Sequence, residues 1–162
     1  MSIDAIVAGL PALSFGDAAP ISWDSFLEAC GSEAGRIVRS LGEGAWADIE
    51  TQLRNAMVDA RGGDAKYCRA ADGCSLYWRD RVRACFQESD ALRRDELIDR
   101  VWWDAAGELT PPAVPLGRGA LLTYAVRLRI ALKRSAISQE KGGVAFDRMT
   151  SATKTQSNNP TI

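Results

Sequence analysis

Apolar side chains recur at steps of three and four residues along much of this chain, a spacing that places them on one face of an α-helix. The clearest stripe lies in residues 45–61 and consists of Trp46, Ile49, Leu53, Ala56, Met57 and Ala60. Gly62 and Gly63 follow the stripe and indicate the end of the helix. The pattern therefore predicts a helix over residues 45–61 that buries one side.

A second strong stripe occupies residues 119–137. Its inner positions are Leu121, Ala125, Leu128 and Leu132, and Gly142 and Gly143 come after it. We expect these two helices to be central to the fold. The side chains expected in the core are Trp46, Leu53, Met57, Leu121, Ala125 and Leu128.

Capping residues mark shorter helices between the two strong ones. Serine and aspartate favour the N-cap, and glycine favours the position just past the end. The expected elements are a helix from Ser22 to Gly31, one over residues 32–41, one over residues 76–86, and one that starts at Ser89 or Asp90 and stops at Gly107.

No stretch alternates apolar and polar residues with a period of two, and the prolines of residues 109–119 predict a rigid loop. The prediction is an all-α fold, a compact bundle of about five or six helices in one domain over residues 1–150. The apolar run that ends at Pro11 is expected to be an extended segment packed along the bundle. Residues 151–162 are polar and are expected to be a disordered tail.

Composition changes this picture little. The chain has 162 residues, of which 46% are hydrophobic and 25% are charged, with a net charge of −1. These values are typical of a soluble globular protein and give no overall signal for nucleic acid or an anionic membrane. No apolar run approaches the roughly 18 residues of a membrane span, and Asp4 stands where a signal peptide is basic. We expect a cytoplasmic protein.

Candidate chemistry is sparse. The chain has no histidine, which excludes triads and dyads that use imidazole. The cysteines at 30, 68, 74 and 85 form no CxxC pair and are expected to be reduced, buried thiols. Carboxylates such as Asp95 and Asp99 alternate with arginines and are interpreted as a solvated helix face. We therefore expect no catalytic residue, no metal, no cofactor and no enzyme activity.

Charge is unevenly distributed. Residues 109–139 contain no carboxylate and five cations, whereas residues 88–108 contain seven carboxylates and three arginines. Two interpretations remain open: the two helices neutralise each other, or the basic helix docks on an acidic partner. A nucleic-acid partner is a weaker alternative, because exposed aromatic residues do not interleave with the basic ones. The candidate partner-binding residues are Arg118, Arg127, Arg129 and Arg134, with Trp103, since adjacent Trp102 and Trp103 cannot both face the core.

Three stretches resemble a bacterial family encoded among V/A-type ATPase genes. "IVAGLPALSF…PISWDSFLEAC" resembles its apolar opening with "LP", a turn and a short helix; "WADIETQLRNAMVDARG" resembles its tryptophan-led helix with "LRN"; and "LLTYAVRLRIALKRSAISQEKGGVAF" resembles its closing helix. In order, the matches span about residues 5–148. Lys133 stands where that closing helix tends to carry Glu before Arg.

That family is similar to the C-type component of the central stalk of A-type ATPases, whose eukaryotic V-ATPase counterpart is the d-type component. This stalk component is an all-α funnel without catalytic activity. The resemblance implies a structural or coupling subunit, or an assembly partner, of a V/A-type rotary ATPase. It implies protein partners in the central stalk or membrane ring, and membrane association only through them. This chain has about half the length of a full funnel. A helical adaptor with an unrelated protein partner would fit the same residues.

Overall fold

The protein is all-α throughout the parts that its computed structural model describes, residues 1–69 and 75–154, with side chains described through residue 140. The α-helices are α1 (Ile3–Gly9), α2 (Trp23–Arg39), α3 (Ala45–Ala60), α4 (Leu76–Cys85), α5 (Ala91–Ala106) and α6 (Arg118–Lys154). Short 3-10 helices η1 (Ser40–Glu43), η2 (Ala65–Tyr67) and η3 (Gly107–Leu109) lie between them. The predicted fold class is confirmed.

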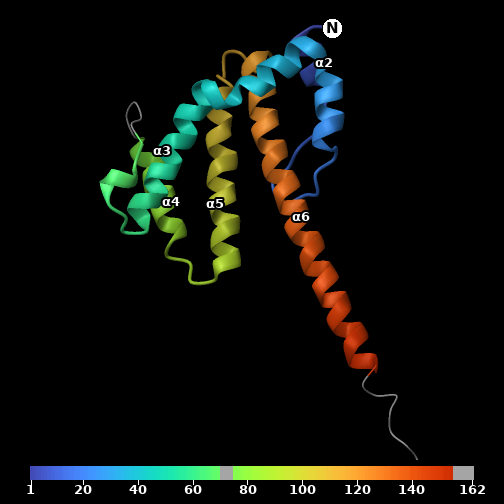
Figure 1. The fold of residues 1–162 in the computed structure, drawn as a ribbon. Helices are drawn as coiled ribbons and strands as arrows, with labels where there is room; N and C mark the ends of the chain where they lie inside the picture. The colour runs from blue at the N-terminus through green and yellow to red at the C-terminus, as the bar shows by residue number, and fades with distance from the viewer. Residues whose placement is uncertain (70–74, 155–162) are drawn as a thin grey trace, which may run out of the picture.

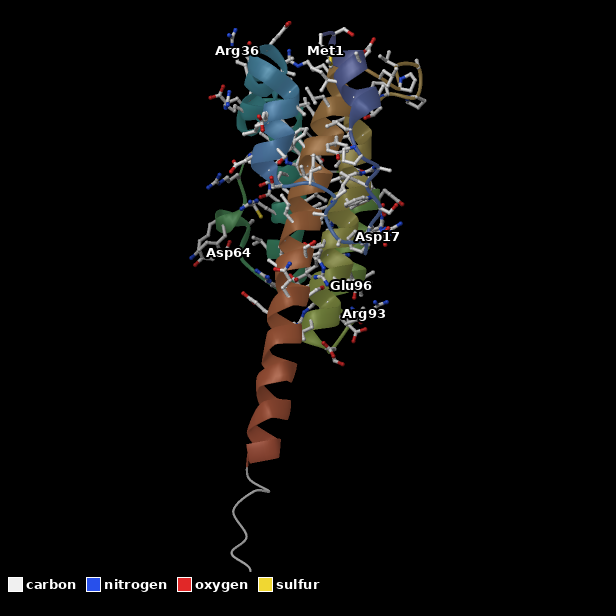
Figure 2. The ribbon with its side chains drawn as sticks, turned by 90° about the vertical axis from the view of Figure 1, so that its right-hand side faces the viewer. Met1, Asp17, Arg36, Asp64, Arg93 and Glu96 are labelled. Atoms are coloured by element: carbon white, nitrogen blue, oxygen red, sulfur yellow. The ribbon has the colours of Figure 1, made fainter. Side chains whose placement is uncertain are left out.

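Four helices form the body of the bundle (Figure 1). α3 packs on α4, α4 on α5, and α5 on α6, while α1 and α2 pack against the first half of α6. α6 then continues well beyond the ends of the other helices (Figure 2). The body therefore leaves α5 in the middle, with α3 on one side and α6 on the other.

The predicted caps are found where the sequence places them. Ser22 accepts a hydrogen bond from the backbone N–H of Ser25, and Asp90 accepts from Leu92 and Arg93, so both satisfy the free N–H groups of a first helical turn. Gly31 has a φ of +73°, which interrupts the helical conformation inside α2. The two helices expected on either side of Gly31 therefore exist as two parts of one kinked element.

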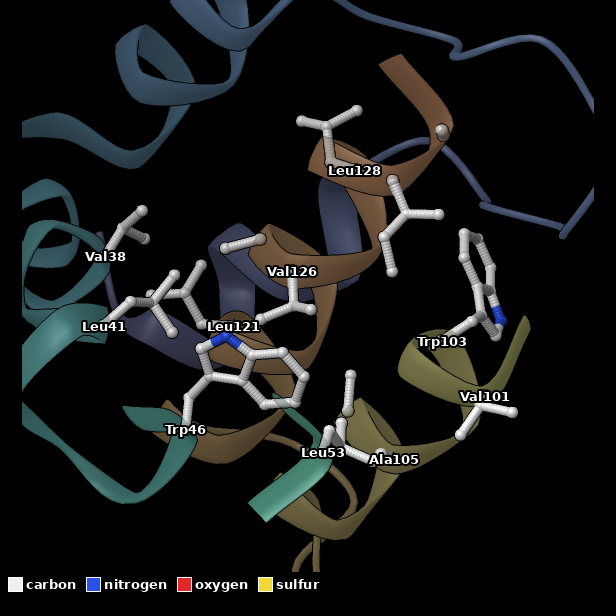
Figure 3. Close-up of a cluster of buried hydrophobic side chains, with 14 of the residues drawn as sticks. Val38, Leu41, Trp46, Leu53, Val101, Trp103, Ala105, Leu121, Val126 and Leu128 are labelled. Carbon is white, nitrogen blue, oxygen red and sulfur yellow. The ribbon is translucent and has the colours of Figure 1, made fainter. Parts of the chain in front are cut away.

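The core joins the two helices with the strongest stripes (Figure 3). Leu53, Leu121, Ala125 and Leu128 are fully buried, and Trp46 is 4% exposed. Met57 is half-buried, so its expected place in the core is wrong. Its side chain borders a hollow that lies between α3, α5 and α6.

The N-terminal run is helical over Ile3–Gly9, so the extended segment expected there starts only at residue 10. Ser2 caps this short helix and Asp4 lies in its first turn, where the helix dipole favours a carboxylate. Residues 10–22 then lie along the bundle. The Tyr124 hydroxyl donates to the Pro11 carbonyl at 2.8 Å, and the Ala19 N–H donates to the Ser135 hydroxyl at 3.0 Å.

The last helix is longer than the sequence indicates. α6 passes through Gly142 and Gly143 and ends at Lys154, so residues 151–154 belong to it and the expected boundary near residue 150 is not found. A glycine inside a helix lowers the stability of the helix by about 1 kcal/mol but does not prevent its formation. Extending an existing helix also costs less free energy than starting a new one. The expected disordered tail from residue 155 onward lies outside the described residues.

A close backbone approach fixes the start of α6. A Cβ at Gly119 would lie 2.1 Å from the Leu109 carbonyl oxygen, a distance that no side chain can tolerate. Glycine at this position therefore lets the proline-rich loop return against η3 before α6 begins.

Candidate functional site

The basic and acidic helices neutralise each other at one end of the bundle. The Lys133 ammonium lies 2.8 Å from a carboxylate oxygen of Asp99 and 3.5 Å from one of Asp95. The Arg134 guanidinium lies 3.2 Å from Asp95 and 3.4 Å from Asp99. For these two cations the neutralising interpretation is confirmed.

Asp99 is the buried member of this cluster. The sequence places Asp99 on a solvated face, but its side chain is only 9% exposed because α6 covers it. Burial alone would lower the pKa of Lys133, yet the hydrogen bond to Asp99 and the charges of Asp99 and Asp95 outweigh burial and raise that pKa above its ordinary value. The cluster joins α5 to α6.

Arg127 also belongs to the interior. Its Nε donates to the Trp103 carbonyl at 3.1 Å, and its guanidinium lies 5.3 Å from the centre of the Trp103 ring. Burial lowers the pKa of Arg127, an effect that the charge of Asp104 opposes and that of Arg100 reinforces. Arg127 thus helps to fix α6 on α5.

Trp103 is 6% exposed and meets the edge of Phe15, with 5.5 Å between the ring centres. Of the two adjacent tryptophans, it is therefore Trp103 that faces inward, and Trp102 is the half-buried one. The interpretation of Trp103 as a surface contact is wrong, because residues 10–22 cover it.

Arg118 and Arg129 remain exposed on the surface. The Arg129 guanidinium lies over the Trp23 ring at 4.7 Å from its centre, and Arg118 opens α6 beside the proline-rich loop. The structure therefore divides the predicted basic set: Arg127 and Arg134 hold α6 in place, whereas Arg118 and Arg129 are exposed. It does not bring the five predicted residues together at one site.

A groove runs between α3 and α6, with α5 as its floor. The hollow between these three helices has a volume of about 440 Å³. Each of the three helices contributes a stripe at helical spacing. The stripes are Trp46, Glu50, Arg54, Met57 and Arg61 from α3; Asp95, Ile98, Asp99 and Trp102 from α5; and Val126, Arg129, Ile130 and Lys133 from α6. We call this surface the α3–α6 groove.

A second hollow of about 490 Å³ adjoins the groove at α3. It shares Trp46, Glu50, Arg54 and Arg129 with the first and adds Tyr67 and Arg69. The Asn55 side chain holds the 68–69 segment here, since its amide donates to the Arg69 carbonyl at 2.7 Å and its oxygen accepts from the Arg69 N–H at 3.0 Å. The groove therefore continues past α3 towards η2.

The charges of the α3–α6 groove do not balance. Glu50 forms an ion pair with Arg54 at 2.5 Å. On α5, Asp99 pairs with Lys133 and Asp95 with Arg134. Arg61 and Arg129 make no ion pair with any described residue and instead lie over aromatic rings, Phe86 for Arg61 and Trp23 for Arg129. The rim thus presents these two guanidinium groups beside a floor that contains both the apolar side chains Ile98 and Trp102 and the ion-paired carboxylates of Asp95 and Asp99.

Sequence reasoning missed this groove. It assigned Met57 to the core and took Trp103, rather than Trp102, as the candidate surface contact. The available signal was the half-polar character of each stripe, because a face that carries Glu50 and Arg54 beside Trp46 and Met57 is not a simple core face. Which three stripes meet is a property of helix packing and cannot be obtained from spacing alone.

The expected burial of the cysteine thiols is found for some of them. Cys30 and Cys85 are buried, and burial raises the pKa of both, whereas Cys68 is half-buried and Cys74 lies outside the described residues. Within residues 1–69 and 75–154 no group of three or more Cys, Asp and Glu side chains has the arrangement of a metal site. In the same part of the chain no helix combines the length and apolar character of a membrane span.

Comparisons of the chain with protein-family models, with curated proteins and with solved structures find no match.

Proposed function

We propose that this protein is a non-catalytic helical component of a V/A-type rotary ATPase, as a subunit or as an assembly partner. It acts at the cytoplasmic face of the membrane, to which it is held by other subunits. Its contribution is to bind and position protein segments rather than to transform a substrate.

Two kinds of observation support the proposal. Stretches that resemble the ATPase-associated family occur in the expected order over about residues 5–148. These stretches fold into α1 with the start of α2, α3, and α6, which are elements that share one hydrophobic core. An all-α architecture is also what the resemblance to the C-type stalk component implies.

The observation that carries a binding role is the α3–α6 groove. The helices α3, α5 and α6 each supply a stripe of side chains to one hollow. This is the arrangement in which a further helix packs against a helical bundle. Apolar side chains flanked by charged ones, such as Met57, Ile98 and Trp102 here, are the usual form of a surface that accepts an amphipathic helix.

A nucleic-acid role has less support. Lys133 and Arg134 are neutralised by carboxylates, and Arg127 is half-buried against Trp103. The basic helix therefore offers phosphate only Arg118 and Arg129 from the predicted set. An adaptor with an unrelated partner remains the second candidate, since the same groove would serve it.

Co-purification from native membranes tests the proposal. An affinity-tagged chain is isolated with mild detergent, and we expect the A, B and D-type ATPase subunits in the eluate in fixed proportion. The variant Leu53→Ala, with a destabilised core, serves as the control for fold-dependent recovery. Absence of all three subunits, while intact ATPase is present in the same extract, would disprove the proposal.

A further inference from the structure

The α3–α6 groove has features that define the chemistry of its occupant. Its floor on α5 combines half-buried Ile98 and Trp102 with Asp95 and Asp99, whose carboxylates pair with Lys133. Met57 lines one wall and Ile130 the other. Its rim has a guanidinium group without a carboxylate partner among the described residues on each side, Arg61 at the C-cap of α3 and Arg129 on α6. Arg54 of α3 also lies on the rim, where it pairs with Glu50. A ligand must therefore combine an apolar stripe with negative charge on both flanks.

We propose that the α3–α6 groove binds an amphipathic helix of a partner protein whose apolar stripe is flanked by Asp and Glu residues. The inference rests on the proposed role as a binding component and specifies which surface binds and what it binds. Apolar positions at i, i+3, i+4 and i+7 of the incoming helix would lie on Trp102 and Met57. Its carboxylates would reach the guanidinium groups of Arg61 and Arg129.

The state of those two arginines favours this occupant. Each lies over an aromatic ring, which holds the planar guanidinium in place while its N–H groups stay available for a bidentate carboxylate contact. Neither has a carboxylate partner among the described residues. The Arg54 side chain is 71% exposed even in its pair with Glu50, so it too can exchange partners.

The charges argue against a second copy of this chain as the occupant. Residues 140–154 of α6 carry Glu140 and Asp147 against Lys141, Arg148 and Lys154. A segment with a net positive charge does not complement a basic rim. Duplex nucleic acid would contact the basic side chains through its phosphates, but it would leave the apolar side chains Ile98 and Trp102 uncovered.

The test uses the full chain and two synthetic helical peptides of three heptads each. Both peptides have leucine at the first and fourth heptad positions; the flanking positions are glutamate in one and lysine in the other. Binding is measured by fluorescence anisotropy at about 50 and 300 mM NaCl, a range over which charge screening strengthens markedly. We expect binding of the glutamate peptide, weaker at the higher salt, and at least tenfold weaker binding of the lysine peptide.

Paired charge reversals locate the binding surface. Arg61→Glu with Arg129→Glu should weaken the glutamate peptide at least tenfold, because both residues lie on the groove rim. The matched control is Arg36→Glu with Arg39→Glu, which changes the net charge equally on exposed positions of α2 outside the groove. The control should bind within about twofold of the wild type. Circular dichroism checks that each variant is folded. If the Arg61→Glu, Arg129→Glu double variant does not fold, the single variant Arg61→Glu is used in its place.

Several results would overturn the inference. These are no binding of the glutamate peptide, equal binding of both peptides, an equal loss in groove and control variants, or tight binding of random duplex DNA that the groove variant abolishes. The same groove variant in the co-purification separates the two proposals. Undiminished ATPase recovery with it disproves the groove inference alone, whereas peptide binding without ATPase recovery from the wild type disproves the ATPase role alone.

Discussion

The Lys133 ammonium donates a hydrogen bond of 2.8 Å to Asp99, a carboxylate that α6 covers almost completely. Arg134, the next residue, reaches the second oxygen of the same carboxylate at 3.4 Å. One aspartate of α5 thus receives two successive cations of α6. Asp95 pairs with the same two cations, but Asp99 is the more buried of the two carboxylates, with a side chain 9% exposed against 42% for Asp95.

Replacing Asp99 by alanine should therefore destabilise the fold, because Lys133 and Arg134 lose the buried one of the two carboxylates that they share and keep only Asp95. We expect a loss of about 1–3 kcal/mol in the free energy of unfolding. Asp95→Ala is the matched control, since the Asp95 side chain is 42% exposed and its loss should cost less than about 1 kcal/mol. Urea unfolding followed by circular dichroism measures both, and equal costs would contradict the assigned geometry.

The same pair predicts a dependence on alkaline pH. A lysine whose pKa is raised on folding contributes its full stability below about pH 10.5, its ordinary value, and loses it as the pH rises through the higher folded value. The stability difference between the wild type and Lys133→Met should be constant from about pH 7 to 9 and shrink above about pH 10.5. Burial also raises the pKa of Tyr124, Cys30 and Cys85, but these groups are present in both chains and cancel in the difference. A difference that grows with pH would refute the prediction.

Leu53 and Leu128 are both fully buried in the core that joins α3 to α6. Truncation of either to alanine should lower the free energy of unfolding by about 2–5 kcal/mol, through lost burial and a residual cavity. Leu92→Ala is the control, because Leu92 is 57% exposed and should change stability little. Thermal and chemical unfolding of the three variants provide the measurement.

Gly119→Ala should be strongly destabilising, since the added methyl group would meet the Leu109 carbonyl oxygen at 2.1 Å and the backbone would have to move. Gly9→Ala introduces the same atom where nothing lies within 4 Å and should be nearly neutral. A normal melting temperature for Gly119→Ala would show that η3 and the start of α6 are not in close contact.

The thiols should differ in reactivity. In a Cys74→Ser background, Cys68 should react first with a thiol reagent at mildly alkaline pH. Cys30 and Cys85 should react much more slowly because they are 4% and 5% exposed and burial raises their pKa values. Mass spectrometry of partially labelled protein identifies the order. Early labelling of Cys85 would mean that α4 opens more readily than its packing indicates.

The helices themselves could be predicted from residue spacing. The stripe from Trp46 to Ala60 and the caps at Ser22 and Asp90 appear in the structure at the predicted places, because the helical period and the caps of first turns are local properties of the chain. The opposite charges of residues 88–108 and 118–134 also indicated that the two helices could neutralise each other, although docking on an acidic partner fitted the same charges.

Tertiary structure decided what those local signals left open. Spacing cannot tell which of Trp102 and Trp103 faces inward; the segment that carries Phe15 settles it by covering Trp103. Nor can it tell that Met57 borders a groove, since that depends on where α5 and α6 lie relative to α3. The sequence by itself determined where helices form, because hydrogen bonds and caps act within a few residues. Packing alone decided that Arg127, Lys133 and Arg134 hold α6 against α5 while Arg118 and Arg129 stay exposed, because burial depends on contacts between distant parts of the chain.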